Sequence, residues 1–211
     1  MSPTAPVVGI LLAGGKSSRM GGGDKCLRPL GGRSILAHII ERLKPQVSDM
    51  IINANGEIAR FAGFGLKVVE DSITGYAGPL AGVQAGLAWI KRNRPDSAYG
   101  VTVATDTPFF PADLVPRFLA ELGNRPVLLV ARSAEGVHPV IGLWPVALAD
   151  DIEDALKHGR HKVGGFTEQH KAIEVPFPPV KIGGTEIDPF FNINRAEDLA
   201  AAEALMSEHA P

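Results

Sequence analysis

The stretch that decides the fold is Val7-Val-Gly-Ile-Leu-Leu-Ala-Gly-Gly-Lys-Ser-Ser-Arg-Met-Gly-Gly-Gly-Asp-Lys25. It opens with an apolar run, Val7 to Leu12, interrupted by a single glycine, and such a run before turn residues is typical of a strand covered on both faces. Glycines and serines follow, with Lys16, Arg19 and Lys25 among them. Successive glycine N–H groups form an anion-binding concavity, and nearby cations suit a polyphosphate. The stretch therefore predicts a buried strand that delivers a nucleotide's phosphates to a Gly-rich loop.

Two better-known phosphate loops do not fit this stretch. A Walker A loop requires G-x-x-x-x-G-K-[ST], but the position five before Gly15 is Ile10. A dinucleotide fingerprint requires G-x-G-x-x-G, and the glycines here do not have that spacing. A solvated Gly-rich surface loop is the remaining alternative. The coincidence of strand, glycines and cations at one strand end argues against it.

The segment from Leu12 to Lys25 resembles the signature of the molybdenum cofactor guanylyltransferase family, in which L-A-G-G is followed by R-M-G and then D-K. Related cytidylyl- and sugar-phosphate-transferring enzymes more often show L-A-A-G, or L-A-G-G without the Asp-Lys pair. The signature alone strongly indicates a nucleotidyltransferase and only weakly indicates its substrate. Further motifs along the chain must decide the substrate.

Length and composition predict one ordinary globular domain. The chain has 211 residues, 45% hydrophobic residues and a formal net charge of −2, which argues against a general nucleic-acid binder. Cys26 is the single cysteine, so an internal disulfide or a thiolate zinc cluster is excluded. With no basic N-terminal region and no apolar stretch of about 18 residues, we expect a cytoplasmic protein without a membrane span. We expect a nucleotide-binding part over about 7–110 and an acceptor-binding part over about 127–195.

The hydrophobic pattern predicts an α/β fold. Strands are expected near 7–12, 50–52, 66–69 and 101–104, and helices lie between them. This alternation favours a mostly parallel central sheet, whereas the strands predicted at 127–131 and 140–144 are too close for a crossover and are expected to be antiparallel. The resemblance implies the three-layer αβα, Rossmann-like nucleotidyltransferase fold.

Ligands of such sheets bind outside the carboxyl ends of the strands, so these ends should carry the site. Asp106 follows the strand at 101–104 in T-D-T-P-F, where it either holds Mg²⁺ or caps a turn before proline. The sequence D-T-P-F also resembles the second signature of the family. Asp106 is therefore the expected metal ligand.

The nucleotide contacts are implied by the resemblance. Asn53 and Asp71 follow two predicted strands and either cap turns or hydrogen-bond the guanine or ribose. Segment 78–82, G-P-L-A-G, either approaches the nucleotide or simply begins a helix. The residues expected to bind GTP are Leu12, Ala13, Gly14, Gly15, Lys25, Asn53, Asp71, Gly78, Pro79, Leu80 and Asp106.

The second half supplies the expected acceptor contacts. His138 lies in H-P-V-I-G-L-W, where it either touches the acceptor or is structural. Arg160 and Lys162 either grip the acceptor's phosphate or belong to a solvated helix end. Asn192 and Asn194 lie in an element that resembles the family's N-x-N-T-P-E-[DE], with Arg-Ala in place of Thr-Pro. Asn194 is also the expected N-cap of the last helix.

The reaction implied by the resemblance is transfer of GMP from GTP to the terminal phosphate of molybdopterin or molybdenum-molybdopterin. Arg19, Lys25 and Asp106 are the expected catalytic residues, with Mg²⁺ neutralising phosphate charge. Transient contacts with molybdopterin-loading proteins and recipient molybdoenzymes are also implied. The alternatives are a cytidylyl- or sugar-phosphate nucleotidyltransferase and a GTP-binding cofactor chaperone without catalytic activity.

Overall fold

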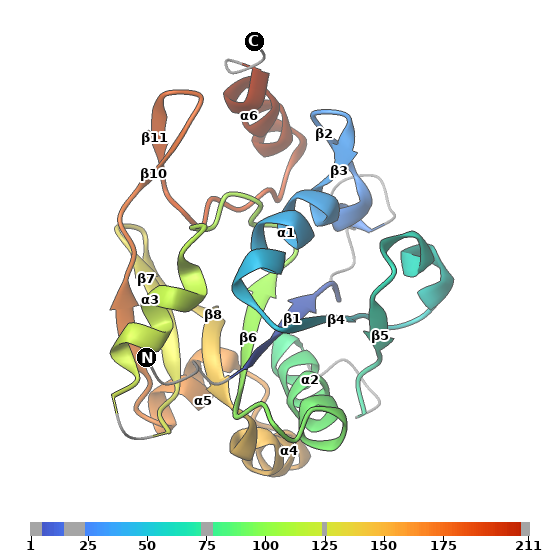
Figure 1. Cartoon of the computed structure of the whole chain (residues 1–211), viewed down its shortest axis with the longest axis vertical. Helices are drawn as coiled ribbons and strands as arrows, with labels where there is room; N and C mark the ends of the chain where they lie inside the picture. Colours follow the sequence, from blue (N-terminus) through green and yellow to red (C-terminus); the bar gives the residue numbers. More distant parts are fainter. Residues whose placement is uncertain (1–5, 15–23, 73–77, 124–125, 208–211) are drawn as a thin grey trace.

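The computed structural model describes residues 6–14, 24–72, 78–123 and 126–207, and its core is a sheet between two layers of helices (Figure 1). In these residues the main sheet has seven strands in the order β5-β4-β1-β6-β8-β7-β9. Its strands are β1 (Val7–Leu12), β4 (Asp49–Asn53), β5 (Lys67–Val69), β6 (Tyr99–Ala104), β7 (Leu129–Ser133), β8 (Gly136–Pro145) and β9 (Ile173–Pro176). The helices are α1 (Ile35–Leu43), α2 (Pro79–Asn93), α3 (Leu114–Glu121), α4 (Ala149–Lys157), α5 (Val163–Gln169) and α6 (Ala196–Ser207). The predicted three-layer fold is confirmed.

Strand β1 lies at the centre of the parallel half, paired with β4 on one side and β6 on the other. Its side chains alternate between two hydrophobic clusters, with Leu11 in one and Ile10 in the other. Gly9 allows α1 to approach, because a Cβ at this position would lie 2.8 Å from Cδ2 of Leu43. The prediction of a strand covered on both faces is therefore confirmed.

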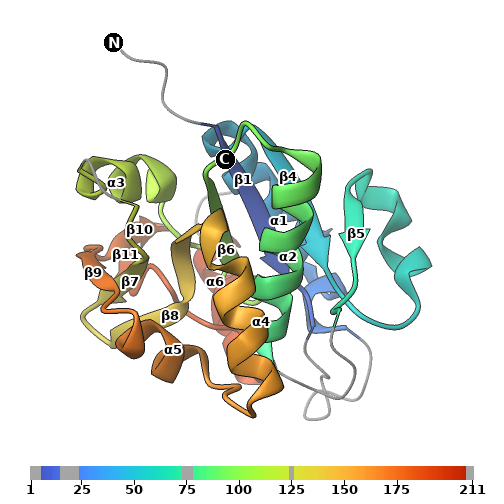
Figure 2. The same cartoon turned by 90° about the horizontal axis from the view of Figure 1, so that it is seen from below.

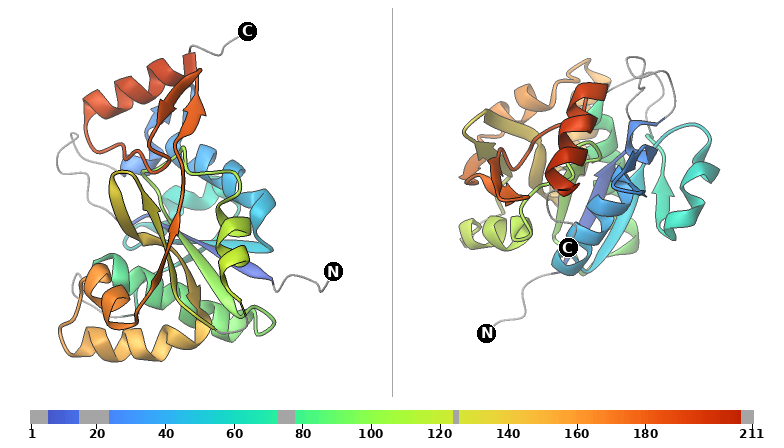
Figure 3. Two further views of the ribbon diagram at one scale, coloured as in Figure 1. Left: turned by 90° about the vertical axis from the view of Figure 1, so that its left-hand side faces the viewer. Right: turned by 90° about the horizontal axis from the view of Figure 1, so that it is seen from above.

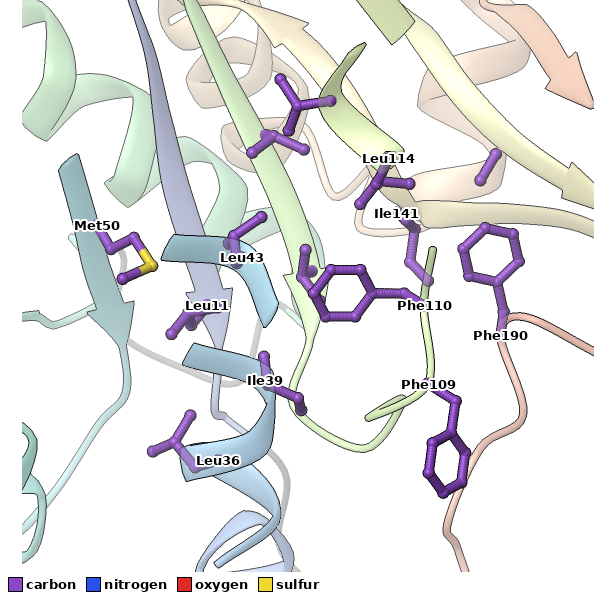
Figure 4. Packing of buried hydrophobic residues seen from close by; sticks show 14 of the residues in the cluster. Leu11, Leu36, Ile39, Leu43, Met50, Phe109, Phe110, Leu114, Ile141 and Phe190 are labelled. Atoms are coloured by element: carbon purple, nitrogen blue, oxygen red, sulfur yellow. The ribbon is translucent and has the colours of Figure 1, made fainter. Parts of the chain in front are cut away.

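The helices divide between the two faces of the sheet. Ser34 caps α1 as predicted, its Oγ accepting a hydrogen bond from the backbone N–H of Ala37 at 3.2 Å. Beyond this cap, Leu36 and Ile39 of α1 pack beside Leu11 of β1 (Figure 4). On the opposite face α2 and α4 run side by side (Figure 2), and residues of α2, α4 and α5 share the second cluster. Both faces of the central strands are thus excluded from water.

Strand β8 runs against its neighbours, antiparallel to both β6 and β7. The expected antiparallel strands are therefore present, displaced from the predicted ranges to β7 and β8. Thr102 secures the pairing of β6 with β8, because its buried hydroxyl accepts a hydrogen bond from Nε1 of Trp144 at 2.8 Å. Because β8 is reversed, its first residues lie at the same edge as the last residues of β1, β4 and β6.

The C-terminal part of the chain returns across this edge. After β9 come the hairpin of β10 (Val180–Ile182) and β11 (Thr185–Ile187), then segment 188–195 and α6. The hairpin and α6 lie at one end of the molecule, near the small hairpin of β2 (Pro29–Leu30) and β3 (Arg33–Ser34) (Figures 1 and 3). Segment 188–195 is attached to the end of β6, since the backbone N–H of Ile193 donates to the carbonyl of Asp106 at 2.8 Å.

The capping of α6 differs from the prediction. The helix begins at Ala196, and the carboxylate of Asp198 accepts hydrogen bonds from the backbone N–H groups of Asn194 and Arg195, both at 2.8 Å. Asn194 does not use its side chain as a cap, because that oxygen is engaged elsewhere. In the part of the chain that the structure describes, none of the helices combines the length and apolar character that crossing a bilayer requires.

Candidate functional site

A cavity of about 840 Å³ opens along the edge where β1, β4 and β6 end and β8 begins. Ligand pockets usually measure about 300–1,000 Å³, so this one is large. Its lining joins both halves of the chain: Leu12, Ala13, Gly14, Lys25, Cys26, Asn53, Asp71, Gly78, Pro79, Ala104, Thr105, Asp106, Thr107, Glu135, Val137, His138, Pro139, Val140, Ile141, Asp188, Phe190, Phe191 and Asn192. We call the part near Asn53 and Asp71, where the sequence analysis expects nucleotide contacts, the nucleotide end, and the part near Glu135, His138 and Asp188 the far end.

Lys25 lines the cavity beside the end of β6, the strand that lies between β1 and β8 in the sheet. Its Nζ donates to Oδ2 of Asp106 at 2.7 Å and to Oδ1 of Asn194 at 2.6 Å. Three segments far apart in the sequence therefore meet at one ammonium group. Of the other residues predicted at the phosphate loop, Gly15 and Arg19 lie outside the described residues.

Asp106 has one carboxylate oxygen to offer to a ligand. Its Oδ2 pairs with Lys25, whereas Oδ1 is buried and accepts no hydrogen bond within the described residues. A buried acceptor without a donor costs about 1–3 kcal/mol, so it favours a positively charged or donating partner. Carboxylate oxygen is also a preferred ligand of Mg²⁺. Asp106 thus fits the metal-binding role that its position predicts.

The nucleotide end is organised around the carboxylate of Asp71. Asn53 and Asn55 each donate an amide N–H to it, to Oδ1 at 2.9 Å and to Oδ2 at 2.8 Å. The backbone N–H of Asp71 in turn donates to Oδ1 of Asn55 at 2.9 Å. These bonds fix the carboxylate at the cavity wall while each oxygen keeps a further lone pair. Asn55 was not predicted, although its place in N-A-N two residues after Asn53 was a usable signal.

Gly82 determines where Asn53 lies. A Cβ on Gly82 would be 2.2 Å from Oδ1 of Asn53 and 2.9 Å from Cδ2 of Leu12. Asn53 is buried, and its amide also donates to the carbonyl of Val69 at 3.1 Å, so displacing it would break existing hydrogen bonds. The glycine in the 78–82 motif therefore makes room for a protein side chain that supports the nucleotide end.

If GTP binds as the sequence analysis expects, Gly82→Ala should raise the KM for GTP by about tenfold, which corresponds to about 1.4 kcal/mol. The added methyl group would displace Asn53 and break its bond to Asp71. Steady-state kinetics with GTP as the varied substrate measures the effect. Gly63→Ala is the matched control, because a Cβ there meets nothing within 4 Å. Equal KM values in Gly82→Ala and wild type would contradict the role of Gly82.

A second ion pair anchors the end of the Gly-rich loop. Arg60 lies in a short 3₁₀ segment (Ile58–Phe64), and its guanidinium binds the carboxylate of Asp24, the residue before Lys25. The same guanidinium donates to the carbonyl of Asn55 at 3.0 Å and lies over the ring of Phe61. Arg60 therefore connects the backbone that carries Lys25 with the segment that holds Asp71, a link that the sequence analysis did not predict.

Cys26 lines the cavity but is not suited to nucleophilic attack. Burial, together with the nearby charge of Asp24, raises the pKa of its thiol to about 11. The thiol is then protonated at neutral pH, and only a thiolate is an effective nucleophile. Cys26 is therefore not a candidate nucleophile of this site.

The far end is built on the start of β8. A hydrogen bond of 2.8 Å joins Nε2 of His138 and Oγ of Ser133. The centroid of the His138 ring lies 4.6 Å from that of Phe190. Burial lowers the pKa of His138, while the carboxylates of Asp188 and Glu135 act in the opposite direction. A lowered pKa leaves the imidazole neutral at pH 7, so His138 contributes shape and hydrogen bonding there rather than charge.

Of the other residues predicted to bind the acceptor, Arg160 and Lys162 do not line the cavity. Arg160 is exposed and pairs with Asp154 at 3.3 Å, and Lys162 is exposed just before α5. The carbonyl of His161, between them, lies 3.9 Å from the position of a Cβ on Gly78, which places this segment beside the start of α2. Asn192 lines the cavity, whereas Asn194 binds Lys25.

Comparison of the sequence with known proteins identifies a protein family that matches most of this chain. A family model described as a MobA-like NTP transferase domain matches residues 9–173. The molybdenum cofactor guanylyltransferase of Bradyrhizobium sp. (strain ORS 278) is 50% identical over 206 residues, covering 97% of this chain and 95% of the relative. The protein of the same name from Rhodopseudomonas palustris (strain BisB5) is 47% identical, with 96% and 94% covered.

Solved structures agree on the fold. The molybdopterin-guanine dinucleotide biosynthesis protein A of Archaeoglobus fulgidus matches with a TM-score of 0.70 at 20% identity, covering 95% of this chain and 99% of that one. A CMP:2-keto-3-deoxy-manno-octonic acid synthetase solved with CTP matches with a TM-score of 0.72 at 13% identity, covering 97% and 100%. The same architecture therefore occurs in proteins whose names refer to different nucleotides, so the fold alone does not select the base.

Proposed function

The chain belongs to the family of MobA-like NTP transferases, and from this premise we propose that it transfers GMP from GTP to the terminal phosphate of molybdopterin. One observation on the cavity supports this proposal. The pair of Lys25 and Asp106 lies between an end that presents a fixed carboxylate, Asp71, and a far end with room for a second substrate. This is the arrangement that joining a nucleotide to a phosphate acceptor needs.

In the proposed reaction an oxygen of the acceptor's phosphate attacks the α-phosphorus of GTP. A new P–O–P bond forms, the bond from the α-phosphorus to the bridging oxygen breaks, and pyrophosphate leaves with that electron pair. The attacking phosphate is already an anion, so no strong general base is required. The barrier is the repulsion between two anions, and it is lowered by positioning and by charge neutralisation.

Lys25 and Asp106 divide that work. Lys25 provides a compact positive charge at the junction of the two ends, where the reacting phosphates meet. When GTP binds, the ammonium group of Lys25 exchanges its hydrogen bond to Asp106 or Asn194 for bonds to phosphate oxygens. A divalent cation held by Asp106, together with phosphate oxygens, would supply further positive charge there. Arg19, Gly14 and Gly15 complete the proposed phosphate site through the Gly-rich loop.

Guanine is proposed to bind at the nucleotide end. Its edge presents two adjacent N–H donors, and a carboxylate fixed by two asparagine amides can accept both. Adenine and cytosine lack this pair of donors. Asp71, supported by Asn53, therefore accounts for a preference for GTP, with Leu12, Ala13, Gly78, Pro79 and Leu80 forming the surrounding wall.

The acceptor is proposed to occupy the far end, against His138 and Asn192. Arg160 and Lys162 are proposed to attract its negative charge at the entrance, since both are exposed beside Gly78. In this proposal residues of about 7–110 hold the nucleotide and residues of about 127–195 hold the acceptor. Asn194 serves by holding Lys25.

The expected product with GTP, Mg²⁺ and molybdopterin is the guanine dinucleotide with one equivalent of pyrophosphate. CTP and ATP are expected to give at least about tenfold lower kcat/KM, the effect of about 1.4 kcal/mol of lost hydrogen bonding. Product mass and pyrophosphate release measure both. Turnover that prefers CTP would indicate a cytidylyl transferase, and GTP binding without pyrophosphate release would indicate a binding protein.

A further inference from the structure

The far end of the cavity is acidic. Among the described residues that line the cavity, Lys25 is the only lysine or arginine, and it is bonded to Asp106 beyond the end of β6. The charged side chains of the far end are Glu135 and Asp188, and His138 is neutral there at pH 7. Such an environment repels an anion. A negatively charged acceptor must therefore place its phosphate at Lys25 and turn an uncharged, hydrogen-bond-donating part toward the far end.

Asp188 is prepared to accept such a donor. Its Oδ1 accepts a hydrogen bond from the backbone N–H of Phe190 at 2.8 Å, which fixes the carboxylate. Its Oδ2 is buried and receives no hydrogen bond from any described residue. A buried carboxylate oxygen without a partner is costly, so the site favours an occupant that donates an N–H to it.

The surroundings of Asp188 suit a flat ring. Val137, Pro139 and Phe191 contribute apolar surface to the same end of the cavity, and the exposed fraction of Val137 is 39%. The rings of His138 and Phe190, tilted against each other with centroids 4.6 Å apart, add aromatic surface. Apolar and aromatic walls with a small number of fixed polar groups are typical of sites that orient a small-molecule ligand.

We propose that Asp188 is the specificity residue for the pterin ring of the acceptor, accepting hydrogen bonds from its 2-amino-4-oxopyrimidine edge. This inference rests on the proposed function, because the pterin enters only with molybdopterin. Guanine carries the same edge, and at the nucleotide end that edge meets Asp71. The cavity then offers one fixed carboxylate to each of two similar heterocycles, with Lys25 and Asp106 between them.

The test compares two small pteridines on the full chain with GTP saturating, so that the nucleotide end is filled. Pterin has the 2-amino group, which can donate a hydrogen bond to the carboxylate of Asp188. In 2,4-dioxopteridine a carbonyl oxygen takes the place of this group, and it would repel the carboxylate. Fluorescence titration is expected to show wild type binding pterin at least about tenfold more tightly, because a buried acceptor left unpaired penalises the analogue. Asp188→Asn is expected to lose this preference, since an amide both donates and accepts.

Glu135→Gln is the comparison variant, because it removes the same charge from an exposed position at the same end. It is expected to keep the preference for pterin. With molybdopterin as substrate, Asp188→Asn is expected to raise the KM for molybdopterin about tenfold and to change kcat and the KM for GTP by less than about twofold.

Three results would overturn the assignment: equal binding of both pteridines by wild type, a preference that survives in Asp188→Asn, or a loss that is the same in Glu135→Gln. The wild-type comparison needs no variant, so it holds even where Asp188→Asn fails to fold. If wild type forms no dinucleotide from GTP and molybdopterin, the proposed function itself fails. If wild type forms the dinucleotide and Asp188→Asn behaves like wild type, the proposed function stands and only the role of Asp188 is contradicted.

Discussion

Asp106→Asn is expected to lower kcat by about a hundredfold or more, a loss on the order of 3 kcal/mol of transition-state stabilisation. The substitution keeps the size of the side chain and removes its charge. A neutral amide is a poorer ligand for a hard cation, and it no longer balances the ammonium group of Lys25 at 2.7 Å. GTP binding is expected to survive within a few-fold, because Lys25 is then less tightly held and remains available to the phosphates.

The measurement for Asp106 is turnover with GTP, Mg²⁺ and molybdopterin, beside a melting curve and a GTP-binding titration. Asp150→Asn is the matched control, since Asp150 pairs with a lysine, Lys91, on the exposed surface at 2.8 Å. It should behave as wild type in all three. If Asp106 only closes a turn before Pro108, Asn should replace it well. A well-folded Asp106→Asn protein with near-normal turnover would remove Asp106 from the proposed mechanism.

Lys25→Met is expected to lower kcat/KM for GTP by about a hundredfold or more, comparable to the loss of a group that stabilises developing charge. Methionine keeps most of the apolar stem but leaves Asp106 and the incoming phosphates as uncompensated anions. Lys25→Arg is expected to restore little of the rate. The ammonium group bonds Asp106 and Asn194 at 2.7 and 2.6 Å, and the wider guanidinium fork cannot reproduce both contacts.

Steady-state kinetics with varied GTP measures the effect of Lys25. Lys91→Met serves as the control, because it removes the same group from an exposed pair with Asp150. The loss in Lys25→Met should also shrink as ionic strength rises, since wild type depends on the attraction that salt screens. An activity within about threefold of wild type would contradict a central role for this residue.

Local patterns were enough to predict the frame of the fold. The apolar run of β1, the Ser34 cap and the short connection between β7 and β8 each have one favourable structure, and all three are found. The edge rule for parallel sheets then placed Leu12, Asn53 and Asp106 around one cavity. These predictions succeeded because each depends on residues that are close in sequence or on a general property of α/β sheets.

The contacts that define the site were harder to foresee, because they join residues far apart in the chain. Asn194 was expected to cap α6, but its oxygen binds Lys25, 169 positions earlier. Nothing in the sequence around Gly82 indicates its role, which becomes clear only when the structure places Asn53 against it. Asp188 looks like an ordinary turn residue before proline. That its Oδ2 is buried without a hydrogen bond from the described residues becomes clear only when segment 188–195 is packed against the end of β6.

The reversed direction of β8 has an evolutionary consequence. The nucleotide end, as we propose it, lies where β1 and β4 end, whereas His138 lies near the start of β8, in the hairpin that β8 forms with β7. Exchanging or lengthening the tip of that hairpin changes no register in the parallel strands. If the acceptor binds at the far end as proposed, changes in this hairpin can therefore alter acceptor choice without altering the parallel strands that carry the nucleotide end.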